Sequence, residues 1–187
     1  MRDSRLPVNP VRACVVINGK PRSGKDTVVD MLTVELAIRG MKAYSFSSID
    51  PVRTVLGIAG IDTSLKTNAD RDLLAEVGLA LEKHSEWRTN KCADNVRATM
   101  AGLKHVLMFV HMREPKLIER LKKKLAPNIR LVTVFVDRAC APKITSNSSD
   151  ANVDDMEYDL QISNNGSLDD LRMACKGALS LIIEMTQ

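Results

Sequence analysis

The stretch GKPRSGKDT at residues 19–27 lies between two segments of different periodicity. The apolar run ACVVIN (13–18) precedes it, and VVDMLTVELAIRG (28–40) follows it with apolar residues at helical spacing. Two glycines separated by four residues, with a lysine directly after the second, have the spacing of a loop that wraps around phosphate groups. Such a loop needs a strand before it and a helix after it, and the flanking patterns predict both.

Several residues of this loop have a predicted part in binding the phosphates of ATP. Gly19 and Gly24 allow backbone N–H groups to turn inward, and the start of the next helix adds the positive end of its dipole. The Lys25 ammonium would reach the β- and γ-phosphates. The predicted phosphate-binding residues are Gly19, Lys20, Arg22, Ser23, Gly24, Lys25, Asp26 and Thr27. The competing interpretation is a glycine-rich strand-to-helix turn with a surface lysine.

The rest of the chain alternates strands with helices. Apolar runs predict strands at 12–18, 42–48, 104–112, 129–136 and 158–163. Helical spacing is found over 26–40, from 51, over 67–85, around 90–101, over 114–126 and over 168–185. This order predicts an α/β fold with a five-stranded parallel sheet and helices on both faces. We expect one domain over 1–187, in which 51–101 is a helical insertion that binds the acceptor and 138–152 is a lid loop.

The loop resembles that of P-loop kinases that carry Gly-Lys-Asp in place of Gly-Lys-Ser/Thr, such as the phage-type deoxynucleoside monophosphate kinases and the animal-type phosphomevalonate kinases. The segments SSIDPVR (47–53) and MREP (112–115) are similar to elements that follow strands two and three in the phage-type enzymes. The resemblance implies a P-loop NTPase fold and Mg²⁺-dependent transfer of the γ-phosphoryl group of ATP to a nucleoside or deoxynucleoside monophosphate. Phosphomevalonate, dephospho-coenzyme A or a nucleoside are alternative acceptors.

Asp26 stands where most phosphate-binding loops have a hydroxyl that binds magnesium. Hard cations prefer oxygen ligands, so the Asp26 carboxylate is the predicted Mg²⁺ ligand, directly or through water. Thr27 is expected to contact phosphate. The alternative role for Asp26 is that of an acidic residue in the first turn of a helix.

Ligands of open α/β sheets lie beyond the carboxyl ends of the strands, so the residues after each strand are candidates for the acceptor side. Within the resemblance, Asp50 faces the transferred phosphoryl group or an acceptor hydroxyl, and Arg53 pairs with an acceptor phosphate. Sequence alone supports an N-cap role for Asp50 equally well, because Pro51 follows it. Arg113 is the expected bidentate phosphate clamp, while Glu114 supports a metal or is an ordinary first-turn acid.

Further cations are expected from the insertion and the lid. Arg71 and Arg88 are the predicted acceptor-binding residues of the insertion, and solvated surface charges are the alternative. In the lid, Arg138 would neutralise charge in the transition state. The predicted catalytic residues are therefore Lys25, Asp50, Arg113 and Arg138. His105 and His111 are expected to be packed within their strand, and NNGSLDDL (164–171) is expected to form a turn and a helix cap.

Composition narrows the class of protein. A net charge of +4 suits a protein that handles small anions and is too low to argue for nucleic acid. No apolar stretch approaches the roughly 20 residues that span a bilayer, and the four cysteines form no CxxC pair, which favours a reducing compartment. We expect a cytoplasmic monomer or homodimer, in the host cytoplasm if a phage encodes it, with nucleotides as its partners and no nucleic acid or membrane.

The sequence gives less support to two other classes of function. A GTP-dependent switch would need a DxxG motif, which does not occur in the sequence, and NKCAD (90–94) is too long for a guanine-binding motif. A degenerate P-loop protein that binds nucleotide without turnover would not need the lysine and arginines that this sequence keeps.

Overall fold

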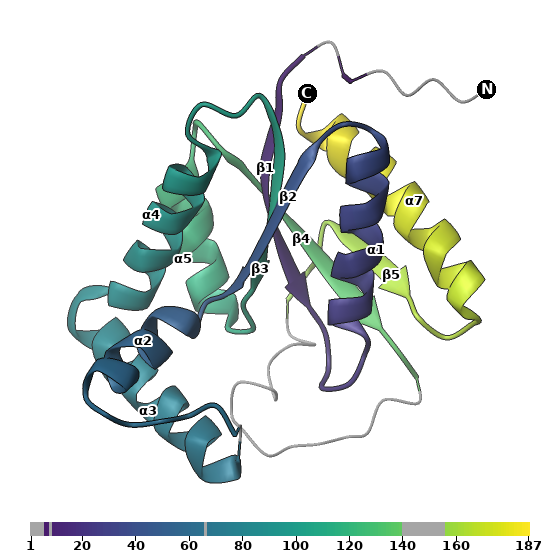
Figure 1. Cartoon of the computed structure of the whole chain (residues 1–187). Helices are drawn as coiled ribbons and strands as arrows, with labels where there is room; N and C mark the ends of the chain where they lie inside the picture. The colour runs from purple at the N-terminus through teal and green to yellow at the C-terminus, as the bar shows by residue number, and fades with distance from the viewer. Residues whose placement is uncertain (1–5, 8, 66, 140–155) are drawn as a thin grey trace.

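The computed structural model describes residues 6–7, 9–65, 67–139 and 156–187. Its strands are β1 (Val11–Asn18), β2 (Lys42–Ser47), β3 (His105–His111), β4 (Arg130–Asp137) and β5 (Leu160–Ser163). Its helices are α1 (Lys25–Ile38), α2 (Asp50–Ile58), α3 (Asn68–Ser85), α4 (Trp87–Met100), α5 (Pro115–Leu125) and α7 (Leu168–Met185). The strands form one parallel sheet in the order β2-β3-β1-β4-β5 (Figure 1).

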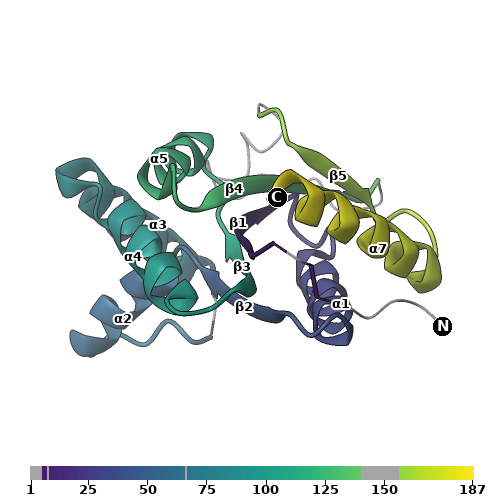
Figure 2. The same cartoon turned by 90° about the horizontal axis from the view of Figure 1, so that it is seen from above.

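Helices cover both faces of this sheet, which confirms the predicted fold class. Helices α1 and α7 lie on one face, and α4 and α5 lie on the other (Figure 2). Alternation along β1 divides the core, since Val15 and Ile17 pack with α1 and α7 while Cys14 and Val16 pack with α4 and α5. A strand buried on both faces must be apolar at nearly every position, and the continuous apolar run at 13–17 reflects this requirement.

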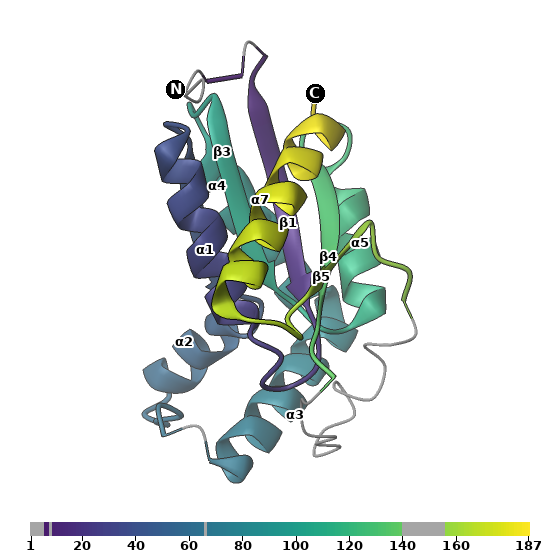
Figure 3. The same cartoon turned by 90° about the vertical axis from the view of Figure 1, so that its right-hand side faces the viewer.

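The carboxyl ends of the strands meet at one edge of the sheet. His111, the last residue of β3, pairs in register with Ile17 of β1 and with Ser47, the last residue of β2. The loop at 19–24 leaves β1 at this edge, and α2 and α3 lie beyond it (Figure 3). The topology therefore gathers the ends of β1, β2 and β3 around the predicted phosphate-binding loop.

The helical insertion has a small core of its own. Val52 and Leu56 of α2 pack with Leu74 of α3, and Trp87 at the start of α4 lies against them. The helix expected around 90–101 begins earlier, at Trp87, directly after α3 ends. The turn between the two helices is the single residue Glu86, which has a positive φ of 52°.

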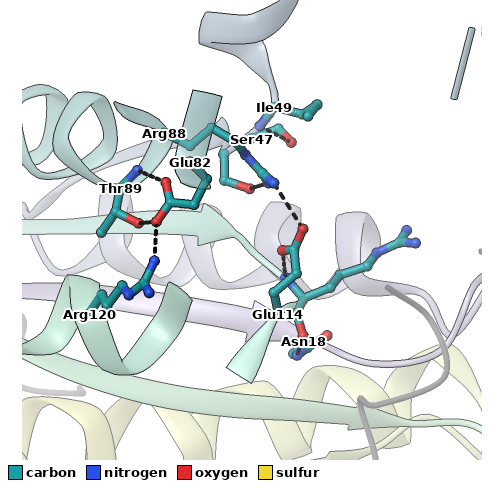
Figure 4. A network of polar contacts seen from close by, with 10 residues as sticks. Asn18, Ser47, Ile49, Glu82, Arg88, Thr89, Glu114 and Arg120 are labelled. Atoms are coloured by element: carbon teal, nitrogen blue, oxygen red, sulfur yellow. Dashed lines mark hydrogen bonds and ion pairs between the residues drawn. The ribbon is translucent and has the colours of Figure 1, made fainter. Parts of the chain in front are cut away.

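A buried carboxylate stabilises this abrupt turn. Glu82 is 3% exposed and accepts hydrogen bonds from the backbone N–H of Thr89 at 3.1 Å and from its hydroxyl at 2.7 Å. Arg120 of α5 donates to the same carboxylate at 2.9 Å. Glu82 thus supplies the N-terminal cap that α4 lacks in its own sequence and fastens the insertion to α5 (Figure 4).

Replacing Glu82 by Gln is expected to lower the free energy of unfolding by about 1–3 kcal/mol at pH 7, the usual cost for a hydrogen bond to a charged group. Burial raises the pKa of Glu82, but hydrogen bonds from Thr89 and Arg120 outweigh burial and hold that pKa below 4.5. The stabilisation is therefore present above pH 4.5 and is lost as the pH falls through the lower folded-state pKa. Urea unfolding over a pH series measures both effects. Glu76→Gln, at an exposed site in the same helix, is the control, and equal results for the two variants would refute this role.

The expected lid at 138–152 lies outside the described residues from 140 onward. In the part of the chain that the structure describes, no helix combines the length and apolar character needed to cross a bilayer.

Candidate active site

The loop between β1 and α1 has a backbone that requires its two glycines. Gly19 and Gly24 have φ values of 143° and 92°, and Arg22 between them has a φ of 61°. A Cβ at Gly19 would lie 2.5 Å from the carbonyl oxygen of Val136 in β4, and one at Gly24 would collide with the Asn164 side chain. The spacing of the glycines therefore reflects both left-handed backbone and close contact with neighbouring segments.

The Lys25 side chain folds back over this loop. Its Nζ atom donates hydrogen bonds to the carbonyl oxygens of Gly19 and Lys20, each at 2.8 Å. The ammonium group is thus held against the backbone at the beginning of the loop. This is the arrangement that a phosphate-binding lysine needs.

His111, at the end of β3, is influenced by several charged groups at this edge of the sheet. Its Nδ1 is 3.9 Å from the Asp26 carboxylate. Burial lowers the pKa of His111; the negative charges of Asp26 and Asp50 oppose this shift, while the positive charges of Lys25 and Arg113 add to it. All four charges act on this imidazole ring, which lies at the edge of the sheet where β1, β2 and β3 end.

The sequence expectation for His111 was incomplete. The ring is packed, with 25% of the side chain exposed, and its Nε2 lies 3.2 Å from the Ser45 hydroxyl of β2. It also faces the phosphate-binding loop, which simple alternation within the strand does not reveal. The available signal was its position as the last polar residue of a buried parallel strand, because that end of the sheet binds ligands.

The carboxylates fit a magnesium ion bound mainly through substrate phosphates. The Asp26 side chain is 95% exposed at the start of α1, and Asp50 shares its surroundings at His111. Among the described residues, no group of three or more His, Cys, Asp or Glu side chains could hold a metal ion. Mg²⁺ usually binds through one or two carboxylates, water and substrate phosphates, so Asp26 is a suitable ligand of this kind.

Asn18 links the phosphate-binding loop to the end of β3. Its Oδ1 accepts a hydrogen bond from the Gly19 N–H at 2.8 Å, and its Nδ2 donates to the Arg113 carbonyl at 3.3 Å. The same Nδ2 donates to the Tyr158 hydroxyl at 2.8 Å. Asn18 is fully buried, so this amide fixes the first glycine relative to Arg113.

The turn after β5 supports the loop from the other side. The expected cap is present, since Ser167 and Asp170 form a capping box at the start of α7. Asn164 also donates to the Ser23 carbonyl at 2.8 Å, and Asn165 accepts from the Ala139 N–H at 2.6 Å. Sequence reasoning assigned NNGSLDDL to a turn and cap alone, because a contact between residues 141 positions apart leaves no local signal.

Replacing Gly24 by Ala is expected to lower the free energy of unfolding by about 2 kcal/mol or more, from left-handed strain and loss of the Asn164–Ser23 hydrogen bond. Gly102→Ala is the matched control, because Gly102 has a φ of 72° with no atom within 4 Å of a built Cβ. That variant should lose only about 1 kcal/mol. Urea unfolding of both variants gives the difference, and equal losses would show that Asn164 does not crowd this glycine.

The predicted acceptor residues occupy different environments. Arg53, in the first turn of α2, lines a cavity of about 420 Å³ together with Gly57 and residues 60–64. Asp50 Oδ2 accepts a hydrogen bond from the Ser47 N–H at 2.7 Å, so this carboxylate also fixes the turn into α2. Arg71 is exposed in the first turn of α3. Arg88 is 5% exposed and pairs with Glu114, which places it behind the acceptor side and not on its surface.

The remaining predicted residues lie along the loop and at the end of β4. Arg22, Asp26 and Thr27 are exposed, and Lys20 is half-buried. Ser23 is fully buried, and within the described residues its hydroxyl has no hydrogen-bond partner. Arg138 is exposed directly after β4.

Several solved structures with a similar architecture are kinases. The APS kinase CysC of Mycobacterium tuberculosis, in complex with AMPPNP and APS, shares 19% identity over 92% of this chain and 98% of that chain, with a TM-score of 0.55. A Cys556Ala mutant of that kinase shares 21% identity over 91% and 99% of the two chains, with a TM-score of 0.54. A gluconokinase from Sinorhizobium meliloti 1021 shares 12% identity over 95% and 97%, with a TM-score of 0.52.

No protein-family model and no curated protein matches the sequence. The likeness to the solved kinases concerns the whole domain, since nearly all of each chain is covered. This chain therefore has the fold of the P-loop kinases, with a five-stranded parallel sheet between two helical layers.

Proposed function

We propose that this protein is a kinase that transfers the γ-phosphoryl group of ATP to a nucleoside or deoxynucleoside monophosphate, giving the diphosphate. The observation that carries the proposal is the position of Lys25 Nζ against the carbonyls of Gly19 and Lys20, with Asp26 3.9 Å from His111 at the edge of the sheet where Asp50 follows β2 and Arg113 follows β3. Phosphoryl transfer needs positioned cations and a metal ligand more than a covalent intermediate, and Lys25, Arg113 and Asp26 supply both.

Each residue has a distinct part in this mechanism. Lys25 releases the carbonyls of Gly19 and Lys20 and binds the β- and γ-phosphates, following the negative charge as it develops. Arg113 holds the transferred group as the acceptor phosphate oxygen forms its bond to phosphorus and the bond to ADP breaks. Mg²⁺ bound at Asp26 would neutralise charge on the phosphate oxygens. Arg138 would approach the same charge from the end of β4.

The acceptor side supports an anionic acceptor. Arg53 lines the cavity beside α2, and its Nε is buried with no hydrogen-bond partner among the described residues. Asp50, one helical turn earlier, accepts a hydrogen bond from the Ser47 N–H at the end of β2. An acceptor that carries a phosphate of its own could pair with Arg53 while its reacting oxygen faces Asp50 and Arg113. Arg71, at the start of α3, is a further cation for that phosphate.

Other small acceptors compete with the nucleotide for this site. One fold supports many chemistries, and the solved kinases of this architecture include an APS kinase and a gluconokinase. Their names make APS and gluconate worth testing beside phosphomevalonate, dephospho-coenzyme A and nucleosides. Arg53 in the cavity beside α2 favours an anionic acceptor over a nucleoside.

Release of ADP from ATP, measured with a panel of these acceptors, tests the proposal. A monophosphate should stimulate ADP release well above the rate with ATP alone, and the stimulation should disappear when EDTA removes Mg²⁺. Stimulation by another acceptor alone would replace the nucleotide while retaining phosphoryl transfer. An enzyme that binds ATP but responds to no acceptor would instead be a nucleotide-binding protein without kinase activity.

A further inference from the structure

The buried cation Arg88 joins the helical insertion to the phosphate-binding end of the sheet. Its Nη1 lies 3.1 Å from Glu114 Oε1, and its Nη2 donates to the Ser48 hydroxyl at 3.2 Å (Figure 4). A guanidinium group removed from water is unfavourable unless it is paired, and the planar fork of Arg88 reaches two partners at once. Ser48 follows β2 and Glu114 precedes α5, so Arg88 ties α4 to two strand ends.

Hydrogen bonds continue from Glu114 to the phosphate-binding loop. Glu114 Oε2 accepts from the Arg113 N–H at 3.3 Å, and the Arg113 carbonyl accepts from Asn18 Nδ2 at 3.3 Å. Asn18 Oδ1 accepts from the Gly19 N–H at 2.8 Å. These contacts form the Arg88 network, which consists of Arg88, Glu114, Arg113, Asn18 and Gly19. It runs unbroken from α4 to the first glycine of the loop.

A glycine in α3 makes room for the arginine. A Cβ at Gly78 would lie 3.0 Å from Arg88 Cδ and 3.4 Å from its Nε, and 3.3 Å from Ile49 Cδ1. Glycine within a helix is less favourable than alanine, so its presence here needs a reason. The Arg88 side chain fills the space that Gly78 leaves. Among the described residues, the Nε atom of Arg88 has no hydrogen-bond partner.

We propose that Arg88 is a positioning residue for phosphoryl transfer, acting through Glu114 on the backbone of Arg113 and, beyond it, on Gly19. The inference rests on the proposed function, because it takes Arg113 as the group that contacts the transferred phosphate. Both the N–H and the carbonyl of Arg113 belong to the Arg88 network, which fixes the direction in which its guanidinium leaves the chain. This role replaces the acceptor contact expected for Arg88, since the side chain is only 5% exposed.

An arginine that merely held α4 in the fold would give a different result. Removing it would lower the free energy of unfolding, but the folded molecules that remain would bind and react as before. A positioning residue changes the folded state itself. The amides of Arg113 and Gly19 report this directly, because each donates a hydrogen bond within the Arg88 network.

The first measurement is amide hydrogen exchange by NMR in the absence of nucleotide, comparing the unaltered chain with Arg88→Met and Arg88→Lys. Arg88→Met should speed exchange at Arg113 and Gly19 by about fivefold or more, relative to the change at core amides of β4. Arg88→Lys should give a smaller change, because one ammonium group keeps the charge and loses the fork. This measurement needs no substrate, so it remains decisive if the proposed kinase activity is absent.

The second measurement is steady-state kinetics of folded enzyme with the acceptor found active. Arg88→Met should lower kcat by about tenfold, as expected from a small displacement of a reacting group, with KM for ATP within about twofold. Arg88→Lys should recover part of kcat. If no acceptor is phosphorylated, the proposed function is wrong. The hydrogen-exchange measurement alone then tests whether Arg88 positions Arg113 and Gly19.

Gly78→Ala tests the same idea without removing a polar group. The new Cβ should push Arg88 away from Glu114, so exchange at Arg113 should rise and kcat should fall by about threefold. Gly177→Ala is the matched control, because Gly177 lies within α7 and no atom is within 4 Å of a Cβ built there. If Arg88→Met does not fold, the comparison of Gly78→Ala with Gly177→Ala still tests the proposal. Unchanged exchange at Arg113 and Gly19 in the folded Arg88 and Gly78 variants, or unchanged kcat in an active enzyme, would overturn the proposal.

Discussion

Replacing Lys25 by Met is expected to lower kcat for ATP-dependent phosphoryl transfer by about 10²- to 10³-fold, the usual cost of removing one donor to a developing negative charge. Met keeps most of the length of the side chain and lacks the ammonium group. The Lys25 Nζ donates hydrogen bonds to the carbonyls of Gly19 and Lys20, and a hydrogen bond of this kind contributes about 1 kcal/mol, so the free energy of unfolding should fall by about that amount. ADP release and urea unfolding measure the two quantities separately.

Lys42→Met is the matched control for Lys25. Lys42 is exposed at the first residue of β2, which is the opposite end of the sheet from the phosphate-binding loop. This variant should retain kcat within about twofold, because surface substitutions away from a site are usually neutral. Equal activity of the Lys25 variant and the unaltered chain would remove Lys25 from the mechanism and with it the reason to regard this loop as catalytic.

Replacing Arg113 by Lys or Ala gives the second large effect. Arg113→Ala is expected to lower kcat by about 10²-fold, since a cation facing the transferred phosphoryl group is lost. Arg113→Lys should restore only part of this activity, because an ammonium group cannot form the paired hydrogen bonds of a guanidinium. Steady-state kinetics at saturating ATP, with the acceptor concentration varied, separates the loss of kcat from a rise in KM for the acceptor.

Arg130→Lys and Arg130→Ala provide the comparison for Arg113. Arg130 is exposed at the first residue of β4, again at the amino end of the sheet. A large rise in KM for the acceptor with unchanged kcat would show that Arg113 binds the acceptor in its ground state and does not act on the transferred group. Similar kinetics for the Arg113 and Arg130 variants would exclude Arg113 from the site.

The fold and the loop were predictable because their signals are local. Apolar runs, helical spacing and the two glycines are each contained in fewer than about 20 consecutive residues, the scale on which periodicity works. The residues after β2 and β3 could also be found, because strand ends of a parallel sheet meet at a common edge. This reasoning selected Asp50 and Arg113, whose charges act on His111 together with those of Lys25 and Asp26.

The supporting contacts were not predictable in this way. The Asn164 amide reaches the Ser23 carbonyl across 141 positions, and Glu82 caps a helix through Thr89 and Arg120. Arg88 shows the difficulty most clearly. An arginine at the start of a helix looks the same in the sequence whether it binds an acceptor or pairs with Glu114 inside the protein.

The sequence by itself determined the order of strands and helices, the position of the glycine-rich loop between β1 and α1 and the chemical types available at the strand ends. Tertiary structure alone decided which of those side chains face the loop, which support it, and which, like Arg88, are buried behind it. The physical reason is that periodicity and glycine spacing act through the backbone over a few residues. Burial and ion pairing instead depend on segments that meet only when the sheet assembles.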